Sequence, residues 1–397
     1  MLERQQEQDP SARRAVPAGI RMVVLDRAGI VSLPAEQWDR LAHEVLVENP
    51  FHDRLQVLAA LQTIDRKKAV KALAFYAGEE LVGLFLYQKR SKVPSPLPVA
   101  NIFHNDYLVH ALPLIHRDHV KPVVEAWVRA VQSGAALGLW AFADVDTTSP
   151  VMRLIEAQAK ATGLTMTSVL PYERAFLTRL DGGFDAHLNQ VLSKNRLKDV
   201  RRTMRRLGEV GQISLEFAEE PALYQQRLEE FLALEHAGWK GEMGTSFLSH
   251  PEDAAFARAA YAPGLSSMAS LLLDGKPIAM KLFIQTGDTA FSPKIAYDES
   301  YKKLGPGMAL EYLLIEDFYA NRRFEAVDAA ATAEGHSALN FFNNQKPMAT
   351  VILGRSGWHV ALLARLHDAR RALKVWVTAQ KARRAEKVRP ATEPEKA

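Results

Sequence analysis

A short turn near the end of the third quarter of the chain has the residue types of a phosphate-binding site. It reads Lys302, Lys303, Leu304, Gly305, Pro306 and Gly307. The two glycines allow a tight backbone turn and keep Cβ atoms away from an approaching group, and Pro306 suits the first turn of a helix. Amide N–H groups and a helix dipole directed at one point favour a phosphate or pyrophosphate. A glycine-rich turn that only starts a helix is the alternative interpretation, because short glycine motifs are weak signals.

The elements around this turn are predicted from periodicity. A strand over 291–297 precedes it, and an amphipathic helix with Leu310, Leu314 and Phe318 at helical spacing follows. Further upstream, the strands 268–273 and 278–284 flank an Asp-Gly turn and form a hairpin. The pattern also predicts strands over 213–217, 326–331 and 350–353 and helices over 221–236, 252–261 and 337–343.

The first half of the chain has the same order of elements. We expect a helix over 38–60, a hairpin over 73–87, and further elements over 99–109 (strand), 120–131 (helix), 137–145 (strand), 150–161 (helix) and 164–180 (extended). The repeat argues for two copies of one α/β fold. At the place of the glycine turn the first half has 110–115, without glycine. Only the second half is therefore expected to bind a phosphate.

Composition narrows the classes of protein. A chain of 397 residues is long enough for two domains. With 50 Lys and Arg against 46 Asp and Glu it is mildly basic, which is compatible with anionic substrates. The absence of cysteine excludes disulfides, zinc–thiolate sites and thiol nucleophiles. Residues 1–18 are expected to be a disordered arm without a signal peptide, and the protein is expected to be cytoplasmic.

Two segments are strongly basic. The connecting helical segment 184–211 carries Lys194, Arg196, Lys198, Arg201, Arg202, Arg205 and Arg206. It is either a solvated face or a contact for the phosphates of an acyl carrier, a nucleotide or RNA. The C-terminal segment 358–397 has an apolar stripe formed by Leu362, Leu366, Ala369, Leu373 and Trp376 beside arginines and lysines. That stripe either packs on the body of the protein or lies on an anionic membrane surface, and disorder is expected beyond about residue 381.

Four segments in the second half carry a family resemblance. They read KNRLKDVRRTMRRLGEVG, LEHAGWKGEMG, LLLDGKPIAM and YDESYKKLGPGMALEYLL, in this order over roughly residues 185–330. Together with the Lys-x-x-Gly-x-Gly turn they resemble the GNAT acyltransferases, and more narrowly the CelD-type acetyltransferase domain, a relative of the FemAB aminoacyl transferases. The resemblance implies an α/β fold of two tandem GNAT-like domains, each a mixed, mostly antiparallel twisted sheet flanked by helices. A degenerate domain would span 19–183 and the acyltransferase domain 184–357.

The resemblance also implies the donor site. Acyl-CoA is the expected co-substrate, with no metal and no covalent intermediate. The free edge of the strand 291–297 would hold the pantetheine arm and the thioester carbonyl, and the glycine turn would hold the pyrophosphate. The cofactor-binding residues expected on this basis are Ile295, Ala296, Tyr297, Lys302, Lys303, Leu304, Gly305, Pro306, Gly307 and Met308.

The acceptor side is less well defined by the resemblance. Asp328, Glu334 and His336 are the candidate general bases, and each also has an ordinary role as a local cap, a surface turn residue or a helix N-terminal residue. After Phe324 the family usually has an Asp, a Gly and a Tyr-Lys pair, and the Tyr has no counterpart here. Trp239, Lys240, Asp106 and Tyr107 are expected to line the acceptor site, although Trp is more often a core residue.

The expected reaction is direct attack of an amine on acyl-CoA, with a small, sugar-linked or lipid-linked amine as acceptor. Cell-envelope metabolism, or polysaccharide or lipid metabolism, is the expected context. A FemAB-like transfer from aminoacyl-tRNA is one alternative, and it alone would involve nucleic acid. A non-catalytic binding protein with two degenerate repeats is the other.

Overall fold

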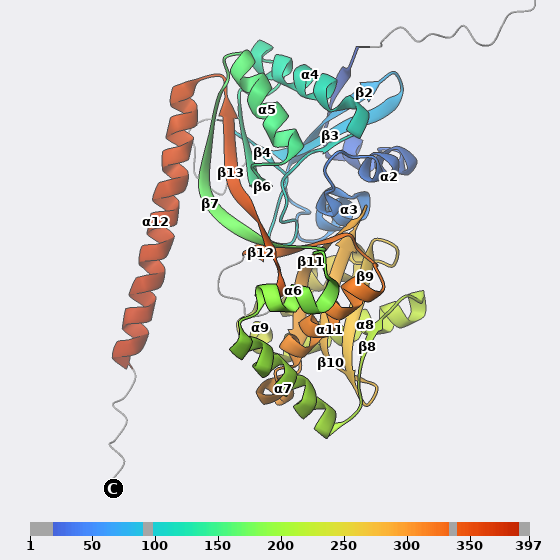
Figure 1. The fold of residues 1–397 in the computed structure, drawn as a ribbon. Coiled ribbons are helices and arrows are strands. Elements are labelled where there is room, and N and C mark those ends of the chain that lie inside the picture. Colours follow the sequence, from blue (N-terminus) through green and yellow to red (C-terminus); the bar gives the residue numbers. More distant parts are fainter. Residues whose placement is uncertain (1–18, 90–97, 333–339, 389–397) are drawn as a thin grey trace, which may run out of the picture.

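The computed structural model describes residues 19–89, 98–332 and 340–388 (Figure 1). The strands are β1 (Arg21–Leu25), β2 (Val70–Ala77), β3 (Glu80–Gln88), β4 (Ala100–Ile102), β5 (Leu114–Ile115), β6 (Leu139–Asp146), β7 (Thr165–Thr178), β8 (Ile213–Phe217), β9 (Ser266–Leu273), β10 (Lys276–Gln285), β11 (Thr289–Tyr297), β12 (Ala326–Thr332) and β13 (Asn344–Gly354). The α-helices are α1 (Arg27–Val31), α2 (Ala35–His43), α3 (Arg54–Gln62), α4 (Val120–Ser133), α5 (Pro150–Ala161), α6 (Gly183–Val191), α7 (Lys194–Val210), α8 (Pro221–Ala237), α9 (Trp239–Glu242), α10 (Pro251–Ala260), α11 (Pro306–Ala320) and α12 (Gly357–Val388). Short 3-10 helices include η2 (Pro50–His52), η3 (Arg117–His119), η4 (Phe247–Ser249) and η5 (Glu299–Leu304).

All thirteen strands of the described residues belong to one continuous sheet. The order is β1-β2-β3-β4-β6-β13-β7-β12-β11-β10-β9-β8, with β5 paired beside β3. Most neighbours are antiparallel, and the parallel pairs are β4 with β6 and β11 with β12. The predicted fold class, two GNAT-like repeats of mixed, mostly antiparallel sheet flanked by helices, is confirmed.

The two halves exchange their last strands at the centre of this sheet. Strand β13, from the end of the second half, lies between β6 and β7 of the first half. Strand β7, from the end of the first half, pairs with β12 of the second. Each half therefore completes its own sheet with a strand from the other. The predicted domain boundaries, 19–183 and 184–357, remain a prediction.

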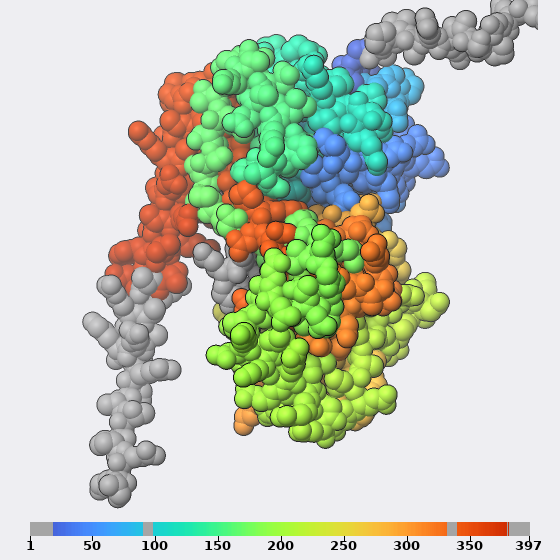
Figure 2. Space-filling model, viewed as in Figure 1, coloured from blue at the N-terminus to red at the C-terminus, as the bar shows by residue number. Residues whose placement is uncertain are grey.

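A shared apolar core also joins the halves, which appear as an upper and a lower lobe in Figure 2. One buried cluster combines α2 and α3 of the first half with α8, α10 and β11 of the second. The Gln56 side chain donates to the Ala260 carbonyl at 2.9 Å, and the Glu48 carboxylate accepts from the amides of Asp288 and Thr289. On the other face of the sheet, α4 and α5 cover the first half, and α6, α7 and α11 cover the second.

Helix α12 lies against the sheet along only part of its length. Val360 and Leu363 are buried against β7 and β13, whereas Leu373 and Trp376 are 60% and 59% exposed. The predicted apolar stripe is thus divided: its first part packs on the body, and its second part faces solvent on a projecting helix (Figure 1). Within the described residues, no helix combines the length and the apolar character needed to cross a bilayer.

Two predicted elements of the first half are wrong in extent. The helix expected over 38–60 is two helices, α2 and α3, because Pro50 begins a 3-10 turn and Asp53 caps α3. The strand expected over 99–109 ends at Ile102, because the Asn105 side chain accepts from the amides of Tyr107 and Leu108 and forms a turn.

Candidate active site

Strands β11 and β12 diverge after three residue pairs. They are paired in parallel from Thr289 with Ala326 to Phe291 with Asp328, and no further. At this point β11 also has a bulge, since Phe291 pairs with Ile284 but Lys294 already pairs with Leu282. The extra residue turns the following side chains over and bends the strand, and Pro293, which has no N–H to donate, lies in the bulge. The result is an opening between two neighbouring strands.

A groove of about 610 Å³ occupies this opening. Its lining comes from β11, η5, the start of α11, the end of α8, α9 and β12. Eight of the ten predicted cofactor residues line it: Ile295, Ala296, Tyr297, Lys302, Gly305, Pro306, Gly307 and Met308. Trp239 and Lys240 of the predicted acceptor set line the same groove. Lys303 and Leu304 are part of the turn but not of the lining.

The glycine turn has the geometry that the sequence predicts. Gly305 has a φ of 62°, a left-handed conformation that favours glycine, and Pro306 starts α11. A Cβ atom on Gly307 would meet nothing closer than the Tyr297 ring at 3.8 Å, so space is open in front of its amide. The first amides of a helix have no intrahelical partner. The turn therefore presents an N–H group and the positive end of α11 to the groove.

One edge of β11 is available to a ligand. The Ile295 carbonyl accepts from Lys240 Nζ at 2.7 Å rather than from a strand. Because both backbone groups of a residue in a strand point the same way, the Ile295 N–H also faces the opening. Tyr297, two residues further, has the same orientation, while the Asp298 amide donates to Ile278 of β10. These amides can bind an extended ligand as an added strand would.

The basic helix α7 lies next to the turn. Its buried side is formed by Leu197, Val200 and Leu207, and its arginines and lysines are exposed. Arg206 donates to the Lys303 carbonyl at 3.5 Å, and Thr203 lies within 4 Å of the Cβ position of Gly305. The basic face is therefore solvated, as the first interpretation expects, and the contact with phosphates remains a prediction for a face that adjoins the glycine turn.

The opposite face of the sheet carries a cluster of charges. The Glu235 carboxylate is fully buried, and its Oε1 accepts from Lys240 at 3.1 Å and from Lys294 at 3.2 Å. The Lys294 ammonium also lies over the rings of Phe247 and Tyr107, at 4.4 and 5.3 Å from their centroids. Tyr107, which the first half contributes, stacks on Phe247 and Phe256. Asp106 beside it is exposed.

A buried ion pair lies on the α11 side of the groove. Lys281 Nζ is 2.7 Å from Glu311 Oε1, and both side chains are almost fully buried. The Lys281 ammonium lies over the ring of Phe283 on its own strand and over that of Phe342. Removal of one member of such a pair would leave an uncompensated buried charge.

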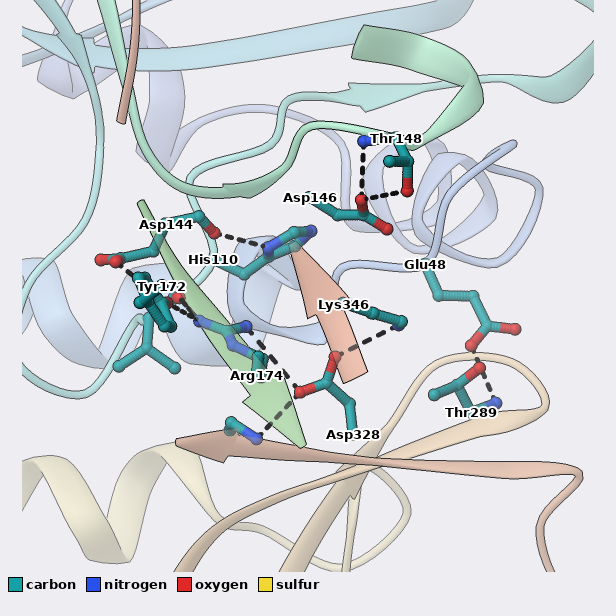
Figure 3. Close-up of polar contacts among 12 residues, drawn as sticks. Glu48, His110, Asp144, Asp146, Thr148, Tyr172, Arg174, Thr289, Asp328 and Lys346 are labelled. Carbon is teal, nitrogen blue, oxygen red and sulfur yellow. Dashed lines mark hydrogen bonds and ion pairs between the residues drawn. The ribbon is translucent and has the colours of Figure 1, made fainter. Parts of the chain in front are cut away.

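Asp328 lies in a polar cluster at the junction of the exchanged strands (Figure 3). Its carboxylate contacts Lys346 at 3.2 Å and Arg174 at 3.8 Å and accepts from the Ala330 amide. Burial and the nearby Arg174 lower the pKa of His110, in the same cluster, to about 3. Asp328 does not itself line the groove, although its neighbour Ala329 does. These contacts favour a structural role for Asp328. The other two candidate bases, Glu334 and His336, lie outside the described residues.

The corresponding opening in the first half is closed by the chain itself. Strands β4 and β6 pair at only two positions, but the Ala111 amide then donates to the Ala143 carbonyl and the His110 ring to the Asp144 carbonyl. The segment 110–111 thus pairs with the β6 edge of this opening, whereas the groove in the second half lies open between β11 and β12. This difference agrees with the expectation that one half binds the donor.

The sequence did not single out Glu235 or Lys294. Each reads as an ordinary helix or strand charge, and 59 residues separate them. The only local signal was the position of Lys294 directly after Ser292 and Pro293, at the bulge in β11.

One group of side chains in the described part of the chain could hold a metal ion. It consists of Glu44, Glu80 and His116, and none of these residues lines the groove.

Comparisons with known proteins agree with this geometry. Residues 194–337 match the family model of the acetyltransferase (GNAT) domain. No protein in a search of curated proteins matches the chain. Two solved structures share the fold. The crystal structure of FemX has a TM-score of 0.53 at 11% identity, covering 81% of this chain and 96% of that one. A C-terminal domain from Agrobacterium fabrum, described as that of a lysylphosphatidylglycerol synthetase, has a TM-score of 0.51 at 13% identity, covering 84% and 95%.

The family match covers the half that carries the open groove and includes the turn and β11. The solved structures extend the likeness of fold over both halves, including the first. The resemblance to the GNAT superfamily, read from the four sequence segments, is confirmed.

Proposed function

We propose that this protein moves an acyl group from acyl-CoA to an amine, and the match of residues 194–337 to the acetyltransferase (GNAT) domain supports the proposal. The observation that carries the proposal is the single groove that joins the glycine turn to the open edge of β11. The α11 end of this groove suits a pyrophosphate, and the edge of β11 suits the extended pantetheine arm. Acetyl is the acyl group that we propose first.

The chemistry follows from the groups on the open edge. A thioester carbonyl that accepts from the Ile295 or Tyr297 amide gains negative charge as the amine attacks, and a preorganised N–H stabilises that charge. An acceptor amine attacks the thioester directly, in a complex that holds both substrates. It must first lose a proton, so a base is required on the acceptor side.

The acceptor enters from the face opposite α11. Trp239 and Lys240 lie there, with Tyr107 and Asp106 of the first half nearby. Neither Tyr107 nor Asp106 lines the groove itself, and Tyr107 would act on the acceptor site through its contact with Lys294. We propose a small, sugar-linked or lipid-linked amine as acceptor and a cytoplasmic location for the reaction.

Calorimetric titration with acetyl-CoA tests the donor. Because Gly307 faces open space, Gly307→Glu places bulk and negative charge in front of the turn, and we expect it to weaken binding at least roughly 30-fold, or about 2 kcal/mol. Gly307→Ala is the matched control and should bind within a few-fold of the natural protein. Absence of binding to the natural protein, or equal binding by Gly307→Glu, would refute the proposed donor site.

Aminoacyl-tRNA is the second candidate donor. The exposed basic face of α7 beside the turn favours it, because arginines and lysines of this kind bind a nucleic-acid backbone. Separate binding titrations with an aminoacyl-tRNA and with acetyl-CoA distinguish the two donors. If the protein binds the tRNA saturably and does not bind acetyl-CoA, and if Arg201→Ala/Arg202→Ala weakens tRNA binding, aminoacyl-tRNA is the donor instead of acyl-CoA. A non-catalytic binding protein is the third possibility, and the GNAT match argues against it.

The projecting half of α12 is proposed as a contact with an anionic membrane surface. Leu373, Val375, Trp376 and Val377 are exposed there among Arg370, Arg371 and Lys374. Apolar and cationic side chains together favour binding to a lipid surface.

A further inference from the structure

We propose that Lys240 is the general base that takes the proton from the acceptor amine. Glu235 positions Lys240, and the charge of Lys294 favours its neutral form. The proposal rests on the proposed function above. Lys240 lines the groove on the face from which the acceptor would enter.

The position of Lys240 is the first argument. It follows the end of α8, lines the groove, and contacts the edge of β11 through the Ile295 carbonyl at 2.7 Å. The amide of that same residue is a proposed donor to the thioester carbonyl. An amine that attacks this carbonyl must therefore pass close to Lys240 Nζ, which meets the requirement that a base lie within hydrogen-bond reach of the proton.

The hydrogen bonds of Lys240 are the second argument. A neutral amine has two N–H donors and one lone pair. Lys240 Nζ makes two hydrogen bonds, to Glu235 Oε1 at 3.1 Å and to the Ile295 carbonyl at 2.7 Å. These two acceptors match the two donors of the neutral form, and the remaining position on nitrogen is left for the groove.

The charge of the cluster is the third argument. Lys240 and Lys294 share one carboxylate oxygen, so two ammonium groups would repel one another at short range. Lys294 has further stabilisation from the faces of Phe247 and Tyr107. Burial, and then the charge of Lys294, lower the pKa of Lys240, while Glu235 opposes the shift. In the proposed resting state, Glu235 pairs with Lys294, and Lys240 is neutral and able to accept a proton.

Other titratable groups also face this cluster. From α10, Asp253 interacts with the Tyr107 hydroxyl and with Lys294. From the end of α8, His236 bonds Ser246, and Glu299 of η5 lines the groove. The charge of Lys294 in turn acts on Asp253.

The proposed acyl transfer conserves protons and electrons. The acceptor ammonium gives one proton to Lys240 Nζ, and its lone pair forms the bond to the thioester carbon. The carbon–sulfur bond breaks, CoA leaves as a thiolate, and the second amine proton ends on that thiolate. Lys240 then returns its proton to solvent.

The first test needs no acceptor. The full-length protein is treated with acetic anhydride over a range of pH, and the labelling of each lysine is measured by peptide mass spectrometry. We expect Lys240 to react at lower pH than the exposed Lys121, and Lys294→Met to move its labelling midpoint to higher pH because the repelling charge is gone. A midpoint equal to that of Lys121, or one unchanged by Lys294→Met, overturns the proposal.

The second test separates proton transfer from binding. Release of CoA thiol from acetyl-CoA is measured with ethanolamine, which is protonated at neutral pH, and with hydroxylamine, which is not. Lys240→Met should lose roughly 100-fold in kcat with ethanolamine, keep its rate with hydroxylamine, and bind acetyl-CoA normally in calorimetry. Lys240→Arg, whose side chain is always protonated and cannot accept a proton, should behave in the same way.

The outcomes test the role of Lys240 separately from the acyl-CoA site. Equal loss with both amines, or no loss with either, overturns the role of Lys240 and leaves the donor site intact. Failure of the natural protein to bind acetyl-CoA overturns the proposed function itself, and the proposal about Lys240 with it.

Discussion

Gly305 and Gly307, two residues apart in the glycine turn, serve different purposes. Gly305 is required by the backbone, since its φ of 62° is costly for any residue with a Cβ atom. Gly307 is required by space, since its own conformation suits other residues and only the ligand needs the room. The sequence motif shows the two glycines as equivalent, and the structure separates their roles.

Stability measurements test this separation. We expect Gly305→Ala to lower the free energy of unfolding by about 1 kcal/mol, because alanine must then adopt a left-handed conformation. Gly307→Ala should leave that free energy unchanged or raise it slightly, because alanine favours a helix. Urea unfolding of both variants gives the comparison. Equal destabilisation by the two substitutions would contradict the assignment.

The candidate bases show that the role of a single residue is hard to predict from the sequence alone. Asp328 is a candidate because it lies on the predicted strand 326–331, and in the structure it contacts Arg174, Lys346 and the Ala330 amide. Lys240 was expected to bind the acceptor, and it does line the groove. Its partners Glu235 and Lys294 come from other elements, so no local pattern indicated that the three would meet.

At the scale of elements, local signals predicted well and pairing between distant strands did not. The Asp274-Gly275 hairpin, the start of α11 and the helices α4 and α5 follow from turn chemistry and periodicity. The position of β13 does not follow, because an apolar strand pairs as well with one neighbour as with another until the whole sheet is built. Its partner β7 lies far away in the sequence.

The exposed surface of helix α12 is predicted to bind anionic membranes. Full-length protein should co-sediment with phosphatidylglycerol vesicles and not with phosphatidylcholine vesicles, because binding needs both the apolar side chains and the nearby cations. Leu373→Glu/Trp376→Glu should abolish this binding without changing the free energy of unfolding, since both side chains are exposed. Undiminished vesicle binding by the double variant would exclude this helix as the contact.

At the scale of the whole molecule, exchanged strands and a shared apolar core join the two halves. The junction includes buried histidines. His52 donates through Nε2 to the Phe103 carbonyl at 2.8 Å, and its other ring nitrogen is buried without a partner. The adjacent Phe51 packs against Phe291 of the second half. Burial lowers the pKa of His52 from 6.5 to about 4.

This shift predicts how stability depends on pH. Because the folded-state pKa lies below the unfolded-state value, the unfolded chain binds the proton first as pH falls. The contribution is complete above pH 6.5 and is lost between pH 6.5 and 4, with a size of about 3 kcal/mol. His52→Gln keeps a donor for Phe103 but cannot titrate, so its urea unfolding should depend less steeply on pH in this range. An unchanged slope would contradict the assignment to His52.

We propose that one half of the molecule holds the acyl donor in the opening between β11 and β12, while the opening in the other half is closed. Hydrogen–deuterium exchange with and without acetyl-CoA tests this most directly. We predict slower exchange on donor binding at residues 294–297 and 305–309, and no change at 100–111 in the first half. Protection confined to the first half, or binding that protects neither β11 nor the start of α11, would contradict it.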